Sequence, residues 1–568
     1  MEKQGPSGSC FLWLKIGIPI KCIFTKIFFV KTIQLYLLAL LSGLLLTFAW
    51  FPHGWTPLIF IAFVPLLLVE RQIASQPEKY HTLILFACSY LSFFTWNLLT
   101  TWWVKNASYG GAALAIICNA LLMTGVFIIY HRVKKRIGEK WQYLIFCCFW
   151  ITWEFLHLDW DLSWPWLTVG NVFADTPELI QWYEYTGVFG GGLWLLSVNC
   201  ILSSCFEKTS NVFKFQFNKK KAIALILVIC IPLLISFIIS GLRFPGLSKI
   251  NTGEEVVVVQ PNIDPYNEKF IGSPEDQLRK MLALAAQKAD KNTSYLLFPE
   301  TAIPNLVWEN RLDQDSCILM LNAFLQGYPK LKIIIGASTA KVYEANEKHS
   351  ATARKFTQDD GYYDDYNTAL QLDKSGRIQI YHKSKLVPGV EKLPFPFIFK
   401  FLDKLALDLG GTTGSLGMQK ERSVFVSPDD EVMKAAPVVC YESIYGEYVS
   451  EYVNNGASFI AIITNDGWWG DTPGYKQHLK YGALRAIETR RWIARSANTG
   501  ISCFITPEGK ILQETSWWVP AVIAGKIQLN SALTFYTKYG DYIARAAMYL
   551  SLLLIIYSLL IRFRIIKK

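Results

Sequence analysis

Apolar residues are distributed in two different ways along this chain of 568 residues. Up to about residue 240 they form long runs that follow one another closely, and one further run lies at 543–561. Most of these runs approach the ~20 residues that a helix needs to cross a bilayer. Between about 250 and 535 the apolar runs are shorter and alternate with polar segments. The pattern predicts a multi-pass α-helical membrane domain, a globular domain and a final membrane helix.

The composition agrees, because 52% hydrophobic and only 18% charged residues make the chain too apolar for an ordinary soluble protein. We expect about eight spans, of which the second and fifth are the shortest. They cover 32–51, 55–69, 82–104, 110–130, 142–158, 186–206, 222–240 and 543–561. The predicted segments are a basic N-terminal segment (1–31), a membrane domain with seven spans (32–245), a globular domain (250–535) and a final helix with a basic tail (540–568).

Basic residues mark one side of the predicted membrane domain. Five Lys or Arg lie in each of 1–31, 131–140 and 207–221, and four follow Ile561, whereas 157–185 has none. Lys and Arg are enriched in cytoplasmic loops, so we expect both termini in the cytoplasm. The globular domain then lies on the outer side of the membrane, which for the inner membrane of a bacterium-like cell is the periplasm. This placement explains the net charge of +11 without a nucleic-acid partner.

The globular segment has the pattern of a layered α/β domain. It opens with a β-branched run at 254–264 that is typical of a buried strand, and a helical pattern follows at 274–290. Lys374-Ser375-Gly376 joins two alternating runs and predicts a β-hairpin. Further strands are expected at 294–304, 331–339, 438–440, 458–465, 501–509 and 521–529. Continuous apolar strands that alternate with helices indicate sheets covered on both faces.

Three reactive side chains, Glu300, Lys383 and Cys440, come just past the ends of predicted strands. Sites in layered α/β folds form at strand ends, so we expect these three to meet. Glu300 would act as general base and Cys440 as nucleophile, while Lys383 and the Tyr441 backbone N–H would hold an oxyanion. A helix that begins after Cys440 would favour its thiolate. Taken singly, each residue also fits an ordinary role: an exposed turn carboxylate, a solvated lysine or a buried thiol.

The remaining cysteines suggest neither a disulfide framework nor a metal site. Nine of the twelve lie in the first 230 residues, and the globular domain holds only Cys317, Cys440 and Cys503. No Cys-x-x-Cys spacing is present, so we expect no metal and no cofactor.

Three segments of the globular domain resemble the catalytic segments of the nitrilase, or carbon–nitrogen hydrolase, superfamily. They are LLFPETAIP (296–304), YHKSKLVPGVEKLPF (381–395) and VVCYESIYGE (438–447), in the same order. A hydrolase domain between spans seven and eight resembles one branch of that superfamily, the apolipoprotein N-acyltransferases. Further similar segments are WNLLTTWW (96–103), 153–171, YNT (366–368), ITNDGWWGDTPGYKQH (463–478) and RAIETRRWIARSANTGIS (485–502).

The resemblance implies an αββα sandwich with Glu300, Lys383 and Cys440 as a catalytic triad. It also implies that the thiol takes a fatty acyl chain from a phospholipid as a thioester. The fatty acyl chain then passes from the thioester to the N-terminal amine of the diacylglyceryl-cysteine of an apolipoprotein. This ping-pong transfer completes lipoprotein maturation. The implied partners are the phospholipid donor, the apolipoprotein acceptor and the membrane, and we expect a monomer.

The same resemblance implies supporting roles for three further residues. Glu391 matches a second carboxylate and is expected to orient Lys383 or to handle a proton. Tyr441 is expected to shape the acyl pocket and Glu442 to support the charge network. Helix capping and packing are the alternative explanation for the last two residues.

Two positions depart from the family pattern. Phe270 follows Lys269 where a tryptophan is common, and Gly389-Val390-Glu391 stands where Phe-Gly-Glu is common. The neighbouring stretch 391–405 holds four phenylalanines and five charged residues. It fits either an amphipathic lid at the membrane surface or a loop packed on the core.

Two other functions are compatible with the sequence. The triad alone also fits a membrane-bound amidase that hydrolyses a small amide, although eight spans exceed what a tether requires. A transporter or receptor would place ionisable residues inside its spans, where Glu154 is the main example here.

Overall fold

The computed structural model describes residues 32–77, 81–209, 212–243, 253–357, 360–392, 415–563 and 565–566. The basic segment 1–31 and the stretch 393–405 of the predicted lid lie outside the described residues, so neither expectation is tested.

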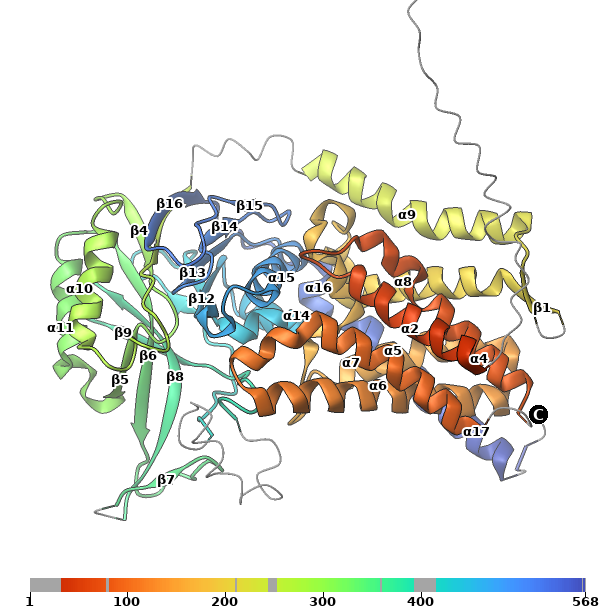
Figure 1. The fold of residues 1–568 in the computed structure, drawn as a ribbon. Coiled ribbons are helices and arrows are strands. Elements are labelled where there is room, and N and C mark those ends of the chain that lie inside the picture. Colours follow the sequence, from red (N-terminus) through yellow and green to blue (C-terminus); the bar gives the residue numbers. More distant parts are fainter. Residues whose placement is uncertain are drawn as a thin grey trace, which may run out of the picture.

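A bundle of apolar helices forms one half of the molecule (Figure 1). Its members are α2 (Thr32–Phe48), α3 (Ile59–Ala62), α4 (Val64–Ser75), α5 (Thr82–Thr101), α6 (Tyr109–Ile137), α7 (Gln142–Leu156), α8 (Tyr183–Ser204), α9 (Lys219–Arg243) and α17 (Tyr542–Arg562). Within the described ranges, six helical segments are long and apolar enough to cross a membrane, α3 and α4 counting together as one. The helices α2 and α7 have only 17 and 15 residues. A helix lies at each predicted run, and the number of spans stays a prediction.

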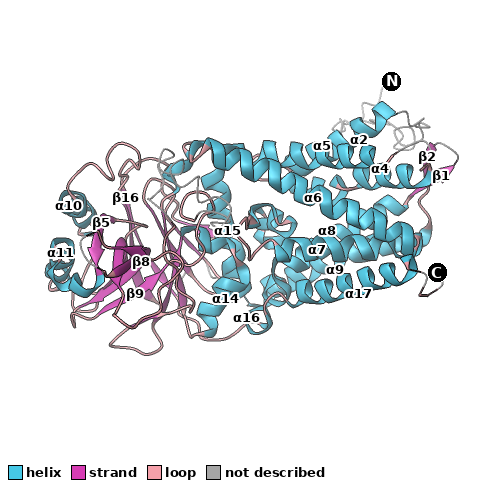
Figure 2. Cartoon of the chain, turned by 90° about the horizontal axis from the view of Figure 1, so that it is seen from below, coloured by secondary structure: helices cyan, strands magenta, loops and turns pink. Residues whose placement is uncertain are grey.

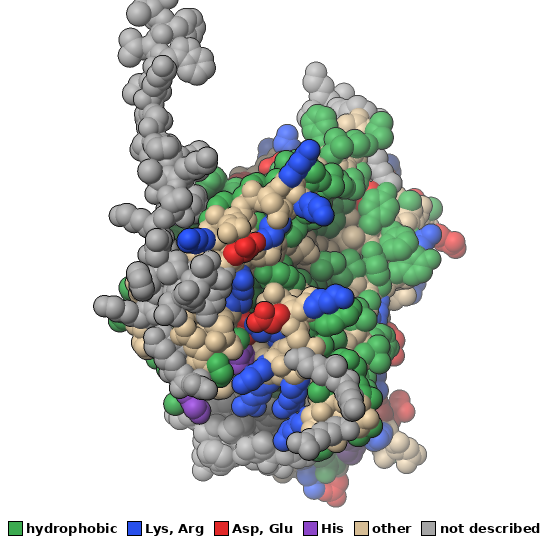
Figure 3. All heavy atoms as spheres, turned by 90° about the vertical axis from the view of Figure 1, so that its right-hand side faces the viewer, with side chains coloured by type: hydrophobic (Ala, Val, Ile, Leu, Met, Phe, Trp, Pro, Cys, Tyr) green, Lys and Arg blue, Asp and Glu red, His purple; other side chains and the backbone are tan. Residues whose placement is uncertain are grey.

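The end of the bundle away from the globular half carries basic residues. Helix α6 ends in Lys134, Lys135 and Arg136, α9 begins at Lys219, and α17 ends at Arg562. Figure 2 shows α17 ending on this side, far from the two large sheets of the globular half. Figure 3 looks onto this end of the molecule and shows Lys and Arg side chains gathered on it. The two large sheets of the globular half therefore lie at the opposite end of the bundle from these charges.

Two sheets form the centre of the globular half. The larger has the order β16 (Ala521–Ile527), β3 (Glu254–Gln260), β4 (Thr293–Leu297), β6 (Lys332–Val342), β8 (Tyr362–Asp373), β7 (Arg354–Lys355), with β5 (Ile303–Trp308) paired to β6 and β9 (Ile378–His382) to β8. The smaller has the order β10 (Phe425–Val426), β11 (Lys434–Val439), β12 (Phe459–Thr464), β13 (Ile493–Ala497), β14 (Cys503–Ile505), β15 (Ile511–Leu512). A separate hairpin, β1 (Phe206–Thr209) and β2 (Val212–Phe215), joins α8 to α9.

Helices cover the outer face of each sheet, which confirms the predicted αββα sandwich (Figure 1). The helices α10 (Pro274–Ala285) and α11 (Ser316–Leu325) lie on the larger sheet. The helices α14 (Gly446–Asn454) and α15 (Pro473–Thr489) lie between the smaller sheet and the bundle, with the short α16 (Phe535–Tyr539) beside them.

The position of β3, the first strand of the domain, explains why its sequence is continuously apolar. Val256 and Val258 pack in one hydrophobic cluster with the smaller sheet, whereas Val257 and Val259 pack in another with α10 and α11. A strand covered on both faces has no side that favours polar residues. The predicted hairpin is also confirmed, because β8 and β9 pair antiparallel around Gly376, which has a φ of 77°.

Polar side chains of α15 and the segment after it join the sandwich to the bundle. Gln477 accepts a hydrogen bond from Trp166 Nε1 at 2.7 Å and donates to the Phe51 carbonyl at 3.0 Å. Arg490 forms a buried ion pair with Glu184 at 2.9 Å. These contacts fix the strand ends of the smaller sheet against the membrane domain.

Candidate active site

Cys440 lies directly after β11 and starts a short 3-10 turn, Cys440–Ile444, that leads into α14. Its backbone has a φ of 52°, in the left-handed region that is costly for a residue with a Cβ. The side chain is buried, with 8% of the residue exposed. The chain therefore turns sharply at the thiol, and neighbouring contacts must hold it in that conformation.

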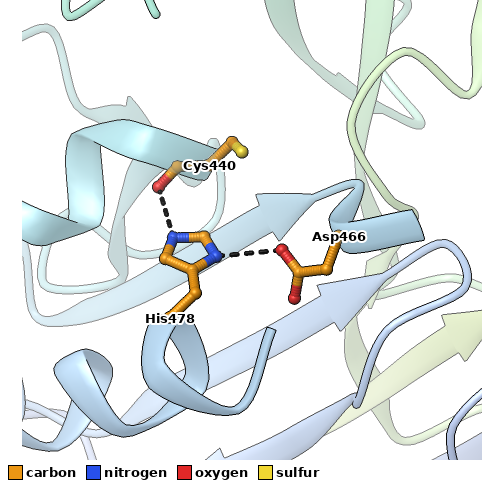
Figure 4. A group of neighbouring side chains, drawn as sticks. All are labelled: Cys440, Asp466 and His478. Carbon is orange, nitrogen blue, oxygen red and sulfur yellow. Dashed lines mark hydrogen bonds and ion pairs between the residues drawn. The ribbon is translucent and has the colours of Figure 1, made fainter. Parts of the chain in front are cut away.

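A buried cluster beneath this turn supplies such contacts (Figure 4). His478, on α15, lies with Nε2 3.1 Å from the Cys440 carbonyl and with Nδ1 2.9 Å from the Asp466 carboxylate. Ser443 donates to the same carbonyl at 2.8 Å. Arg495, on β13, donates to the other Asp466 oxygen at 2.6 Å. The nucleophile's backbone is thereby tied to α15 and to the smaller sheet.

The ligand atoms of Cys440, Asp466 and His478 lie within 4.8 Å of one another, which raises the question of a metal. Both ring nitrogens of His478 already face oxygen atoms of the chain. The guanidinium of Arg495 donates a hydrogen bond to the second Asp466 oxygen, and its positive charge would repel a metal ion. The donor set fits a hydrogen-bonded support better than a metal site.

Glu300, Lys383 and Glu391 form one buried charge network. The turn after β4 carries Glu300, and Lys383 directly follows β9. Lys383 Nζ lies 2.9 Å from Glu300 Oε1 and 2.8 Å from Glu391 Oε1. Asn367, on β8, donates to the same two carboxylates at 2.8 and 2.9 Å. The structure thus brings together the two acidic groups and the lysine that the sequence singled out.

Opposing effects set the ionisation of this network. Burial alone would raise the pKa of Glu300, but the ammonium groups of Lys383 and Lys269 outweigh it and hold that pKa below its usual value. Burial would lower the pKa of Lys383, but the carboxylates of Glu300 and Glu391 raise it well above normal. The resting network therefore contains an ionised carboxylate beside a firmly protonated lysine.

The thiol itself is protonated at rest. Burial, followed by the nearby Glu300 carboxylate, raises the pKa of Cys440 well above its ordinary value, and Lys383 offsets only part of this. The expectation that a following helix favours the thiolate is wrong, because desolvation outweighs any such effect. A base is consequently required before Cys440 can attack a carbonyl.

Lys269 is a second buried cation of the site, and we did not predict it as a site residue. Its Nζ donates to the Glu300 carbonyl at 3.2 Å, and the residue is 4% exposed. Burial lowers the pKa of Lys269 to about 8, although the Glu300 and Cys440 side chains act in the opposite direction. The adjoining Phe270 is 60% exposed and lines the same cavity.

The absence of a side chain at Gly336, on β6, leaves space for the Glu300 turn. A Cβ at this position would lie 2.4 Å from the Thr301 nitrogen and 2.6 Å from the Glu300 Cα. The Gly336 N–H donates to the Pro299 carbonyl at 3.1 Å, which fixes the turn against the strand. Only a residue without a side chain allows this approach.

The two residues after the nucleophile have different surroundings. Tyr441 lines the cavity and donates its hydroxyl to the Ser163 carbonyl at 3.2 Å. Glu442 is fully buried and accepts the N–H groups of Val439 at 2.8 Å and Ser384 at 2.7 Å. It therefore links the nucleophile turn to the loop after Lys383, as the capping alternative described. Among the described residues, the hydrogen-bond partners of Glu442 include neither Glu300 nor Lys383.

A cavity of about 450 Å³ connects these side chains with the membrane domain. Glu300, Lys383, Glu391 and Cys440 line one part of it. One face of α6 lines another part, through Gly111, Leu114, Ala115, Cys118 and Leu122. The reactive groups are therefore continuous with an apolar channel along a membrane helix.

Comparison with known proteins identifies the family of this chain. The family model for the apolipoprotein N-acyltransferase N-terminal domain matches residues 42–201, and the carbon–nitrogen hydrolase model matches residues 255–535. An apolipoprotein N-acyltransferase from Chlorobaculum tepidum is 32% identical over 90% of this chain and 94% of its own length. The chain belongs to the apolipoprotein N-acyltransferase family.

Other relatives of the family are more distant. Apolipoprotein N-acyltransferases from Geobacter metallireducens and Haemophilus influenzae are 27% and 26% identical, over 90% and 94% of this chain and 93% and 96% of their own lengths. Among solved structures, an amidase of the nitrilase superfamily from Nesterenkonia is similar over 53% of this chain and 99% of its own, with 15% identity and a TM-score of 0.36.

Proposed function

We propose that this chain transfers a fatty acyl chain from a phospholipid to the N-terminal amine of a diacylglyceryl-cysteine, with Cys440 as the acyl carrier. The observation that carries the proposal is the continuity of the buried thiol and its charge network with the apolar channel along α6. An acyl chain in that channel would present its ester to Cys440.

In the first half-reaction Glu300 takes the thiol proton as Cys440 Sγ attacks the ester carbonyl carbon. Lys383 Nζ and the Tyr441 N–H stabilise the oxyanion that forms. The ester C–O bond then breaks, Glu300 returns the proton to the leaving oxygen, and lysophospholipid departs. Glu391 and Asn367 hold Lys383 and Glu300 in place through their hydrogen bonds.

In the second half-reaction the α-amine attacks the thioester carbonyl. The C–S bond breaks as the amide forms, and the proton lost by the nitrogen returns to Cys440 through Glu300. This ping-pong sequence requires that water be kept from the thioester. Burial of Cys440 and the aromatic walls of the cavity, among them Trp103 and Trp166, support that requirement.

The family and the apolar helices place the chain in a bacterial inner membrane. We propose further that the basic end of the bundle faces the cytoplasm with both termini, and that the sandwich faces the periplasm. The charges at the ends of α6, α9 and α17 support this orientation. The four predicted segments, with boundaries near residues 31, 250 and 540, belong to the same proposal.

The test is a transfer assay with purified protein in micelles, labelled phospholipid and a diacylglyceryl-cysteine peptide. Wild-type protein is expected to yield the triacylated peptide, whereas Cys440→Ala yields none and Glu300→Gln is slower by at least about 100-fold. Hydrolysis of a small amide without transfer to the peptide would instead support the membrane-bound amidase.

A further inference from the structure

Two buried side chains hold the carbonyl oxygen of Cys440, and neither takes part in bond making in the proposed reaction. His478 Nε2 lies 3.1 Å from this oxygen, as Figure 4 shows, and Ser443 Oγ donates to it at 2.8 Å. His478 and Ser443 are both 1% exposed, and neither lines the cavity that holds the thiol. They therefore act on Cys440 from outside the space that the substrate would enter.

The partners of His478 define what its ring offers. Nε2 faces the Cys440 carbonyl, and Nδ1 lies 2.9 Å from the Asp466 carboxyl group. Burial alone would raise the pKa of Asp466, but Arg495 and His478 hold it well below its usual range, so Asp466 is ionised. A carbonyl and a carboxylate only accept hydrogen bonds, and the Ser443 hydroxyl already gives its hydrogen to the carbonyl. Both ring nitrogens therefore donate, and the ring carries a positive charge.

The carbonyl that His478 holds belongs to the same planar peptide unit as the Tyr441 N–H. A hydrogen bond to the carbonyl oxygen polarises this unit and makes its N–H a stronger donor. A charged donor has the larger effect, because charge-assisted hydrogen bonds are about twice as strong as neutral ones. The Tyr441 N–H is one of the two groups that stabilise the oxyanion in the proposed reaction.

The orientation of this peptide unit also depends on the buried contacts. Cys440 has a φ of 52°, and a return to an ordinary φ would reorient the unit that follows it. His478 is held in turn by Asp466, whose second oxygen accepts a hydrogen bond from Arg495, on β13, at 2.6 Å. All of these side chains are buried. The direction of the Tyr441 N–H is thus tied to the smaller sheet.

We infer that His478 is a positioning residue whose charged ring orients and polarises the Cys440–Tyr441 peptide unit, so that the Tyr441 N–H stabilises the oxyanion. Ser443 acts on the same carbonyl in the same direction, as a neutral and weaker donor. The inference rests on the proposed function and deepens it, since it assigns the control of one of the two oxyanion donors.

The experiment compares two reactions of Cys440 in the full-length protein in micelles, each followed by the mass of the Cys440 peptide. Acylation by p-nitrophenyl palmitate passes through an oxyanion, whereas methylation by methyl iodide forms none. Both reactions need the thiolate, so the ratio of the two rates cancels any effect of a variant on the thiol proton. We expect His478→Leu to lower the ratio of acylation to methylation by about 30-fold and Ser443→Ala by about fivefold.

His478→Gln and Ser450→Ala are the controls. A glutamine amide places an N–H group near the position of Nε2, so the ratio is expected to stay within about fivefold of wild type. Ser450 is a buried serine of α14 that does not line the cavity, and its hydroxyl has no hydrogen-bond partner among the described residues. Ser450→Ala should therefore leave the ratio unchanged.

An unchanged ratio in His478→Leu, with both rates falling together, would overturn the inference, because His478 would then support only the thiol. An equal fall in His478→Leu and His478→Gln would also overturn it, since a restored donor would make no difference. If His478→Leu does not fold, Ser443→Ala must still give a lower ratio than Ser450→Ala. Failure of the proposed function looks different, because wild-type Cys440 would then take no acyl chain from a phospholipid.

Discussion

At the scale of single residues, the reactive groups were predictable because each stands at the end of a strand. Lys383 Nζ lies within 3 Å of a carboxylate oxygen of both Glu300 and Glu391. Their partners were not predictable. Asn367 lies in the middle of β8, and Lys269 precedes an exposed loop residue, so neither stands at a strand end. The family resemblance included both positions, through YNT (366–368) and through Lys269-Phe270, but assigned neither residue a role. Their proximity arises only when the strands assemble.

The charge of Lys269 gives a prediction for the pH dependence of Cys440 loading. Its ammonium helps to keep the pKa of Glu300 low, so Lys269→Met removes that effect and raises the pKa. Because Glu300 must be ionised to act as base, the acid limb of the loading rate moves to higher pH, by roughly one unit.

The measurement is a pH profile of loading by wild type, Lys269→Met and Lys288→Met. Lys288 is an exposed lysine of the same domain and serves as the control. An unchanged acid limb in Lys269→Met would show that this cation does not act on the base.

At the scale of elements, strands with continuous apolar sequence were predicted, and the central strand β13 was missed. Its sequence, IARSA, contains Arg495 and Ser496, which are polar yet buried. Arg495 is tolerated there because Asp466 pairs with it at 2.6 Å. Burial alone would raise the pKa of Asp466, but Arg495 and His478 hold it well below its usual range. A buried ion pair between two separate elements leaves no periodic pattern in the sequence.

The approach of β6 to the Glu300 turn gives a prediction at this scale. Gly336→Ala places a Cβ within 2.6 Å of backbone atoms of Thr301 and Glu300, so the turn must move. Displacement of a base by even about 1 Å is expected to slow loading roughly 100-fold.

Gly327→Ala is the control for this substitution. Its Cβ would make an ordinary contact of 3.5 Å with the Phe324 carbonyl, so loading should stay close to wild type. Equal loading by both variants would mean that the Glu300 turn tolerates the displacement.

At the scale of the whole molecule, the sandwich and the bundle meet through α15 and α16, which both pack on α8, and the cavity opens between the two halves. The sequence predicted both parts and their order along the chain. It did not predict the contact between them, because residues such as Gln477 and Trp166 are 311 positions apart and pair only in the assembled structure.

The proposed orientation predicts how intact cells respond to protease once their outer barrier is removed. Exposed segments of the sandwich should be cleaved, whereas a tag after residue 568 should be protected, since α17 carries the chain back across the membrane. Cleavage of the tag together with protection of the sandwich would require the opposite orientation.

The acyl carrier is the central claim, and the mass of the peptide that contains Cys440 tests it most directly. After exposure to phospholipid, wild-type protein is expected to carry one fatty acyl group on this peptide. Hydroxylamine should remove it, as for a thioester, and the diacylglyceryl-cysteine peptide should remove it as triacylated product. An unmodified Cys440 in protein that still transfers acyl chains would contradict the account.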